Sequence, residues 1–516
     1  MASLSRRQFV MGAAVLGGTL ALGGCAPQNK EEGAATGDAG EGLSADIVVI
    51  GSGLAGEACA RSAAQNGAKV ILVDKAPFIG STFQTSMGNV SICQVPENED
   101  YWQFIDGETD TMDAFLTRYR AATETGKVDA PYPDYDRVQA VMQASCETIS
   151  WLEEIGVDFQ QSFTKDQVGT DTVKPDVSAA AAGQVGGALF VEKMQAELEN
   201  LGVNIMLSTE ATELIQEGDA VTGVRVDGPD GKQDIMARAV VLAVGGFGGS
   251  KEYCDQLVPA INKIGFQYQG NALNTGDGMT MAKAVGAALY DDCWVIPNVI
   301  VPSRALTAVD QQFSLICDPS VWGQAFEGGH TSDKLLVDAA GTRFINEASP
   351  AIALATTMAD RDAAPYYVLF DGSDAEVTAL LEKGLDTGDV VKAESVEQLA
   401  QDSGVAGLAE TFATYQAAAA AGTDGEFNKK AENLVPYQEG PFYLVSYVPS
   451  YVATMGGVKT DANCQAVRED GSAIDGLYAI GETTHRFMYN RSFVRHCSNS
   501  SALTMGRLTG KALAQA

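Results

Sequence analysis

The sequence has few basic residues, few histidines and no compact cysteine motif. Lys and Arg number 34 against 67 Asp and Glu, which gives the 516-residue chain a formal net charge of −33. A surface this acidic repels nucleic acid and anionic lipid headgroups, so neither is expected as a partner. The nine cysteines form no C-x-x-C pair and no C-x-x-C-H site. This argues against a zinc ribbon, a compact iron–sulfur motif or an attached c-type haem, although scattered cysteines leave a cluster open.

The chain also lacks an apolar run long enough for a comfortable transmembrane helix. The motif SRRQF at residues 5–9 precedes a short apolar stretch, as in a twin-arginine export signal. The motif LGGC at residues 22–25 resembles a lipobox that would make Cys25 a lipid anchor, and simple cleavage nearby is the alternative. We therefore predict that residues 1–45 are a signal and flexible tether. The protein would be exported to the periplasm or the outer face of the cytoplasmic membrane, with membrane contact only through Cys25.

A βαβ unit opens the remaining chain. Residues 45–50 read as a buried parallel strand, residues 57–66 as a helix stopped by Gly67, and residues 69–74 as a second strand. The motif GSGLAG lies directly between the first strand and the helix, and Asp74 follows 18 residues after its last glycine. This context is typical of a dinucleotide-binding turn.

Each residue of that turn has a physical role in such a site. Gly51 permits the tight turn, Gly53 lets the backbone approach a pyrophosphate, and Gly56 allows close packing of helix on strand. The pyrophosphate would lie at the helix N-terminus, where free N–H groups favour negative charge. Asp74 would accept hydrogen bonds from the adenosine ribose. The motif alone does not separate FAD from NAD.

The length predicts more than one domain. Further buried strands are expected at residues 240–244 and 476–482, and two helices between residues 394 and 421. Because the nucleotide fold begins at residue 46 and is completed after residue 450, it must contain a large insertion. We predict an α/β protein with a Rossmann-like FAD-binding domain (46–297 and 451–516) and an inserted α+β capping domain (298–450).

Several further segments resemble the fumarate reductase and succinate dehydrogenase flavoprotein family. The matches are IGST at residues 79–82 leading to SMG at 86–88, EATELI at 210–215, LAVGGFGG at 242–249, TGDG at 275–278, TMGGV at 454–458 and GLYAIGE at 476–482. The resemblance is strongest to soluble exported reductases of the urocanate reductase type, and extends to 3-ketosteroid 1-dehydrogenases. It implies FAD as the cofactor, bound by Gly51, Gly53, Ala55, Gly56, Asp74, Thr82, Gly88, Ala211, Asp277, Glu482, Ser498 and Asn499.

The resemblance also implies a reaction, in which the flavin passes a hydride to one carbon of an activated alkene and an arginine protonates the other. Here the sequence departs from the family's dicarboxylate reductases. The position of the proton-donating arginine, four residues after Glu347, is Ala351. The family's two substrate-binding histidines are replaced near Pro297, Asn298 and Ala453. Fumarate is therefore not the expected substrate.

Other residues are candidates for the missing roles. Glu327 and His330 stand where the family has a proton relay, although they also fit a surface turn. Arg491 and Arg495 bracket the position of the family's substrate-binding arginine, and we favour Arg495 slightly. Such an arginine suits a carboxylate or a polarised carbonyl, or else contacts phosphate or backbone. Tyr489 is a candidate proton donor, or else a packing residue. No metal ligands are expected.

We therefore predict an FAD-dependent oxidoreductase that reduces an activated carbon–carbon double bond of a small enoate or enone. Its electrons would come from an external donor, either a cytochrome or a quinol-linked membrane protein, because the chain has no haem motif. This would be a role in anaerobic respiration. The first alternative is a dehydrogenase that introduces such a double bond, as in the ketosteroid enzymes. The second is a flavin-carrying electron-relay subunit with no substrate of its own.

Overall fold

A computed structural model describes residues 42–80, 89–91, 112–124, 129–157, 159–165, 173–179, 186–302, 332–349, 351–361, 364–388, 390–494 and 497–516. Residues 42–516 group as one unit by their backbone contacts. Within the described ranges, none of the helices combines the length and apolar character needed to cross a membrane. The predicted export signal and Cys25 lie outside the described residues, so they remain predictions.

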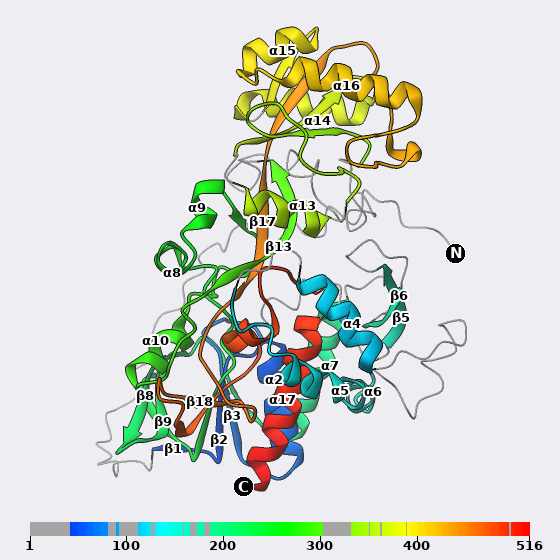
Figure 1. Cartoon of the computed structure of the whole chain (residues 1–516). Helices are drawn as coiled ribbons and strands as arrows, with labels where there is room; N and C mark the ends of the chain where they lie inside the picture. Colours follow the sequence, from blue (N-terminus) through cyan, green and yellow to red (C-terminus); the bar gives the residue numbers. More distant parts are fainter. Residues whose placement is uncertain are drawn as a thin grey trace, which may run out of the picture. The chain divides into compact units, whose positions relative to one another are not determined.

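The centre of the nucleotide-binding part is a six-stranded sheet with the order β18-β19-β11-β2-β3-β7 (Figure 1). All neighbouring pairs are parallel except β18 with β19. Every side chain of β2, β3 and β11 is buried, which explains their uninterrupted apolar sequences. The predicted Rossmann-like core is confirmed. The strands are β2 (Ile47–Ile50), β3 (Val70–Val73), β7 (Asn204–Met206), β11 (Ala239–Leu242), β18 (Gln465–Val467) and β19 (Ala473–Ala479).

Helices cover one face of this sheet, and a smaller sheet covers the other (Figure 1). Helix α2 (Leu54–Gln65) packs against α17 (Cys497–Gln515) and α7 (Gly186–Asn200). A Cβ on Gly506 would lie 2.3 Å from the Ala55 carbonyl oxygen, so glycine lets α17 approach α2 at backbone distance. The smaller sheet has the order β1-β10-β9-β8 and consists of β1 (Leu43–Ser44), β8 (Glu210–Glu217), β9 (Ala220–Gly228) and β10 (Gly231–Met236).

A second six-stranded sheet is organised around the long strand β17 (Phe442–Met455). Strands β13 (Trp294–Pro302), β15 (Tyr366–Asp371) and β16 (Val390–Ala393) pair antiparallel with it. The sheet is completed by β12 (Gln267–Tyr268) and β14 (Leu335–Val337). Helices α13 (Ala351–Asp360), α14 (Ala375–Gly384), α15 (Val396–Ser403) and α16 (Leu408–Ala421) belong to the same part of the sequence.

The domain boundaries predicted at residues 297/298 and 450/451 fall inside β13 and β17. Because each strand continues across a predicted boundary, both run from the nucleotide-binding part into the inserted segment. The two strands also pair with each other. The two helices predicted between residues 394 and 421 are present as α15 and α16. Gly422 ends the second of them with a φ of 65°, the left-handed conformation typical of a glycine C-cap. The capping role of the insertion stays a prediction.

The remaining described elements are short. A three-stranded sheet contains β4 (Asn89–Ser91), β5 (Phe159–Lys165) and β6 (Val173–Ala179). The other helices are α4 (Met112–Thr123), α5 (Tyr135–Gln143), α6 (Ser145–Glu153), α8 (Lys251–Leu257), α9 (Ala260–Ile264) and α10 (Asp277–Ala284). Three 3-10 helices span Leu385–Thr387, Ala431–Asn433 and Gly481–Met488 (η6). The five cysteines with described side chains are buried free thiols.

Candidate active site

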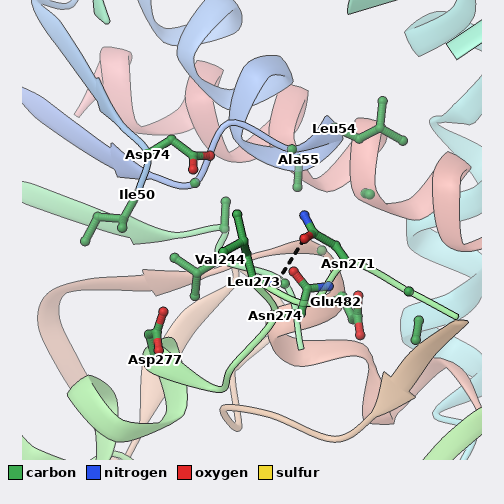
Figure 2. Close-up of a pocket in the computed structure, with 18 of the residues that line it drawn as sticks. Ile50, Leu54, Ala55, Asp74, Val244, Asn271, Leu273, Asn274, Asp277 and Glu482 are labelled. Atoms are coloured by element: carbon green, nitrogen blue, oxygen red, sulfur yellow. Dashed lines mark hydrogen bonds between the residues drawn. The ribbon is translucent and has the colours of Figure 1, made fainter. Parts of the chain in front are cut away.

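A cavity of about 430 Å³ lies where the carboxyl ends of β2, β3 and β11 meet the C-terminal segment (Figure 2). This volume is within the usual range of cofactor sites. The end of a parallel sheet is also where α/β folds bind nucleotides. Its lining includes the residues Ile50, Gly51, Gly53, Leu54, Ala55, Asp74, Lys75, Ala211, Val244, Asn271, Leu273, Asn274, Asp277, Ile296, Ala453, Glu482, His485, Phe493, Ser498 and Asn499.

The glycine turn has the geometry that the motif predicts. Gly51 has a φ of 100°, and a Cβ there would lie 2.3 Å from the Ala243 carbonyl oxygen. A Cβ on Gly56 would lie 1.8 Å from the Gly51 carbonyl oxygen, so close packing requires glycine. Gly53 is the N-cap of α2, and no side chain caps this helix end. The first N–H groups of α2 therefore remain available to an anion at the cavity wall.

Asp74 occupies the end of β3, as expected for the ribose-binding carboxylate. Its Oδ2 accepts hydrogen bonds from the backbone N–H and the hydroxyl of Ser52, each at 2.6 Å, and its Oδ1 accepts from the Ala76 N–H at 2.8 Å. These bonds fix the carboxylate beside the glycine turn. Across the cavity, Asp277 forms an ion pair with Lys75 at 2.5 Å. The predicted cofactor residues Ala211 and Asp277 thus line the same cavity as Asp74.

Glu482 begins η6 and faces the same cavity (Figure 2). Its Oε1 accepts hydrogen bonds from the backbone N–H of Thr454 at 2.8 Å and from the Thr454 hydroxyl at 3.0 Å. Burial raises the pKa of Glu482 to about 7, against the opposing effect of these bonds. Gly246 makes this arrangement possible, because a Cβ there would lie 2.2 Å from the Glu482 carboxylate.

His485 provides a direct test of whether a polar cofactor fits here. The Ser501 hydroxyl donates to the Ser498 carbonyl at 3.0 Å, so it must accept from His485 Nε2, 3.2 Å away. Nδ1 is therefore the unprotonated nitrogen, and it is buried without a partner in the described part of the chain. Burial lowers the pKa of His485 to about 4. The cavity wall thus contains an unused neutral acceptor, which suits a ligand with N–H or hydroxyl donors, such as a flavin with its ribityl chain.

The predicted residues of the C-terminal segment come together at the start of α17. Ser498 and Asn499 line the cavity in the first turn of this helix. Tyr489 is fully buried behind them, and its hydroxyl lies 2.8 Å from the Ser498 hydroxyl. The Tyr489 ring stacks against Tyr119 at 6.4 Å and meets His485 edge-on at 5.7 Å. Tyr489 therefore packs against two aromatic rings and also contacts Ser498, which lines the cavity. Its role as a proton donor stays a prediction.

Arg491 lies on the loop between Tyr489 and α17. Its guanidinium carbon lies 3.9 Å from the ring centroid of Trp294, and burial lowers the pKa of Arg491. The loop is fixed by the neighbouring Arg486, which is fully buried, forms an ion pair with Asp292 at 2.8 Å and donates to the carbonyls of Tyr489 and Asn490. Of the two arginines predicted for substrate binding, Arg491 is the one that the structure describes.

Five predicted site residues lie outside the described residues: Thr82, Gly88, Glu327, His330 and Arg495. Their roles stay predictions. Of the three positions predicted to replace the family's histidines, Ala453 lines the cavity beside its register partner Ile296, while Pro297 and Asn298 are not in the described lining. The wall is apolar at this point. The replacement itself stays a prediction. Ala351, in place of the family's arginine, is the first residue of α13.

Sequence reasoning missed several residues of the site. Lys75 was not singled out, although it directly follows Asp74 and pairs with Asp277. Asn274 was also missed, and its amide lies against Gly245, where a Cβ would be 2.8 Å from Oδ1. Trp294 and Glu57 gave no signal, because a tryptophan in an apolar strand and a glutamate in a first helical turn are both ordinary.

Glu57 is a fully buried carboxyl in the first turn of α2. Neither carboxyl oxygen has a partner in the described part of the chain. Desolvation, with a smaller contribution from Asp74, raises the pKa of Glu57 well above its ordinary value of 4.5. Burial without a partner favours the protonated form of this carboxyl, since ionisation there is costly. It thereby avoids adding a negative charge next to the anion site at the helix end.

We expect the substitution Glu57→Gln to flatten the pH dependence of stability. The native protein holds a proton on Glu57 that the unfolded chain loses above pH 4.5. Stability should therefore fall by about 1.4 kcal/mol per pH unit from there up to the raised pKa. Denaturation midpoints measured from pH 5 upward should show the advantage of the variant growing with pH until the raised pKa is reached. Glu410→Gln, at an exposed acid in the first turn of α16, is the control. Parallel curves for wild type and Glu57→Gln would contradict the assignment.

Comparison with known proteins identifies the family. The chain matches the family described as "FAD binding domain" over residues 46–501. It is 27% identical to a urocanate reductase from Eggerthella lenta, over 91% of this chain and 75% of that protein. It is also 27% identical to a 3-oxosteroid 1-dehydrogenase from Mycobacterium tuberculosis, over 85% of this chain and 92% of that one. A solved structure of a flavocytochrome c3 fumarate reductase superposes with a TM-score of 0.66 at 26% identity, covering 92% of this chain and 79% of that chain.

The family that these matches indicate agrees with the groups found in the cavity. The uncapped end of α2, Asp74 and the unpaired acceptor on His485 are the groups that an FAD molecule would use. The chain therefore belongs to the FAD binding domain family and is an FAD-dependent oxidoreductase of the fumarate reductase type, which acts on CH–CH groups.

Proposed function

We propose that this protein reduces an activated carbon–carbon double bond of a small organic molecule, with electrons from an external donor. Bound FAD supplies the hydride for this reaction from its N5 position. The observation that carries the proposal is Arg491, a half-buried cation without a hydrogen bond or ion pair in the described part of the chain. Its buried Nε–H has no acceptor there, and burying such a donor without a partner is costly. Such a residue beside a flavin cavity is suited to bind a substrate oxygen.

Different residues around the cavity would bind different parts of FAD. Gly51, Gly53 and the first turn of α2 would hold the pyrophosphate, while Asp74 and Glu482 would accept hydrogen bonds from sugar and ribityl hydroxyls. Ser498 and Asn499 present the start of α17, whose N–H groups favour negative charge. Ala55 and Gly56 let the backbone of α2 pack closely against α17 and the glycine turn.

Arg491 would hold the carbonyl group next to the double bond. Reduction of such an alkene builds negative charge on that oxygen, and a fixed cation stabilises this charge most when water is excluded. The second carbon requires a proton. Tyr489 is one source, because its buried hydroxyl keeps its proton and contacts the Ser498 hydroxyl at the cavity wall. The Glu327–His330 pair is the other source that the sequence suggests.

The setting of the enzyme follows from its sequence. We propose that the insertion at residues 298–450 caps the flavin, as an α+β domain. The SRRQF and LGGC motifs support export by the twin-arginine route and a lipid anchor at Cys25. An exported flavoprotein without a haem motif needs a cytochrome or a quinol-linked membrane protein as electron donor. This arrangement is typical of anaerobic respiration.

The test is reduction of alkenes by the purified protein under nitrogen. With reduced methyl viologen as donor, we expect viologen oxidation that depends on an enone or enoate and yields the saturated product. Omitting the alkene, or using the protein after removal of FAD, provides the controls. If no alkene is reduced but the oxidised protein dehydrogenates saturated ketones, the dehydrogenase alternative replaces the proposal. If neither reaction occurs, an electron-relay role is favoured.

A further inference from the structure

Arg491 and Trp294 form a stacked pair in which both partners have an unused hydrogen-bond donor. The ring of Trp294 is only 4% exposed and lies 3.9 Å from the guanidinium carbon of Arg491. The indole Nε1 and the guanidinium Nε are both buried without a hydrogen-bond partner within the described ranges. Each of these N–H groups can only donate. The pair therefore lacks an acceptor.

A second stacked pair of arginine and tryptophan in the same protein shows that such a pair does not generally leave its indole N–H without an acceptor. Arg61 lies 3.8 Å from the ring centroid of Trp151. There the indole Nε1 donates to Gln65 Oε1 at 2.7 Å, and Arg61 donates through Nη1 to the Trp151 carbonyl and pairs with Glu154. Arg61 Nε has no hydrogen-bond partner in the described part of the chain either, so the two pairs differ at the indole N–H and at the Nη groups of the arginine. The Trp151 pair has acceptors from the protein for its indole N–H and for its guanidinium. Within the described ranges the Trp294 pair has neither, so its donors are available to an acceptor from outside those residues.

The position of the pair relates it to the flavin cavity. Trp294 and Ile296 are two residues apart on β13, so their side chains lie on the same face of the strand. Ile296 and its register partner Ala453 line the cavity. Arg491 is two residues before Phe493, which also lines it. Helix α13, which begins at Ala351, packs on β13. Trp294 and Arg491 thus each lie two residues along the chain from a residue of the described cavity lining, and the strand of Trp294 packs against the helix that begins at Ala351.

Among the described residues, the charges around Arg491 balance. Arg486, Asp292 and Asp360 lie within electrostatic range of it, and Arg486 pairs with Asp292. Two positive and two negative groups give this cluster a formal charge of zero. A substrate carboxylate would therefore add a net negative charge near Asp292 and Asp360. No histidine compensates at Ile296 or Ala453, where the wall is apolar. A neutral carbonyl oxygen accepts hydrogen bonds without that repulsion.

We propose that Trp294 and Arg491 jointly donate hydrogen bonds to the carbonyl oxygen of a neutral α,β-unsaturated ketone or ester. Trp294 is then a specificity-determining residue, which supplies one donor and the ring that orients the guanidinium. This inference rests on the proposed function. In the reaction, the β-carbon receives a hydride from the reduced cofactor, the α-carbon receives a proton, and the external donor restores the two electrons.

Three substrates with one skeleton test this inference: 4-phenylbut-3-en-2-one, methyl cinnamate and cinnamate. They present a ketone, an ester and a carboxylate next to the same double bond. We expect kcat/KM for the ketone and the ester to exceed that for cinnamate by roughly tenfold or more, since charge repulsion of this kind costs a few-fold to tens-fold in affinity. Trp294→Phe keeps an aromatic ring, although a smaller one, and removes the N–H. It should lower kcat/KM for the ketone by roughly 10- to 100-fold, as for the loss of one donor to a developing oxyanion.

A binding measurement distinguishes the loss of a substrate contact from misfolding of the variant. The saturated ketone 4-phenylbutan-2-one should perturb the absorption of the oxidised flavin on titration, with a higher Kd in Trp294→Phe than in wild type. Trp151→Phe is the matched control, because it alters the other stacked tryptophan, and it should leave kcat/KM and Kd unchanged. FAD content and melting temperature should match wild type in both variants.

Each outcome decides the question. Full activity and unchanged Kd in Trp294→Phe would overturn the role of the indole N–H. A preference for cinnamate would overturn the assignment of a neutral substrate. Failure of the wild type to reduce any of the three, together with fumarate and acrylate, would contradict the proposed function itself and this inference with it.

Discussion

Arg491→Ala is expected to lower alkene turnover by about 10²- to 10³-fold while FAD stays bound, the loss measured when one oxyanion donor is removed from an enzyme. The guanidinium stacks on Trp294 and is not part of the described cavity lining, so FAD binding should survive its removal. Turnover with an enone and the flavin absorption of the same sample would be measured together. Loss of activity with retained flavin is the predicted combination.

Matched variants make this result specific. Arg491→Lys keeps the charge and removes the planar donors, so it should recover little activity. Arg120→Ala removes another stacked arginine, which lies 3.8 Å from the Tyr135 ring outside the flavin cavity, and it should have no effect. Arg495→Ala belongs in the same series, since the sequence alone favoured Arg495. Full activity of Arg491→Ala with loss in Arg495→Ala would transfer the role to Arg495.

The second large effect is expected from Arg343→Met, which breaks a buried ionic cluster in the inserted segment. Arg343 donates to Glu347 at 2.8 Å and to Asp424 at 2.9 Å, and Lys429 pairs with Glu347 at 3.2 Å. All four side chains are at most 2% exposed. Removing one partner leaves buried charge uncompensated, which typically costs about 3–5 kcal/mol. We expect a drop of this size in the free energy of unfolding.

Denaturant titration of the FAD-loaded protein measures this change. Arg225→Met is the control, because Arg225 also binds two carboxylates, Glu213 and Asp234, but all three side chains are well exposed. Its midpoint should stay near wild type. An equal, small effect of the two substitutions would contradict a stabilising role for the buried cluster.

The same cluster predicts an acid-sensitive fold. Desolvation opposes ionisation of Asp424, but hydrogen bonds from Arg343 and from backbone N–H groups outweigh it and hold the pKa of Asp424 below its usual 3.8. A lowered carboxyl pKa contributes stability above the ordinary value, and this is lost as the pH falls below it. Arg343→Met should therefore lose less stability between pH 5 and pH 3 than wild type.

Much of the nucleotide-binding part could be predicted because its signals are local. The glycine turn, the buried strands and Asp74 are fixed by backbone space and burial, and these leave a mark in the sequence over a few residues. The C-cap at Gly422 is of the same kind. By contrast, β13 and β17 pair residues about 150 positions apart, and no local pattern reveals their shared register or that both cross the predicted domain boundary.

The polar side chains of the site were harder to predict for a physical reason. Lys75 is a site residue because Asp277 lies opposite, and Trp294 because Arg491 stacks on it. The free nitrogen of His485 likewise follows from its contacts with Ser501 and Ser498. Each role depends on a partner brought close by folding. The resemblance to the family gave the cofactor and reaction, but it favoured Arg495 only slightly over Arg491.

The central claim is that the reduced flavin of this protein delivers its electrons to an activated alkene. The most direct measurement is a single turnover: the protein is reduced under nitrogen, excess donor is removed, and 4-phenylbut-3-en-2-one is mixed in while the flavin spectrum is followed. We predict that the oxidised flavin spectrum returns at a rate that depends on the ketone concentration, with one saturated ketone formed per flavin. A flavin that stays reduced with this ketone and with every other alkene offered would contradict the account.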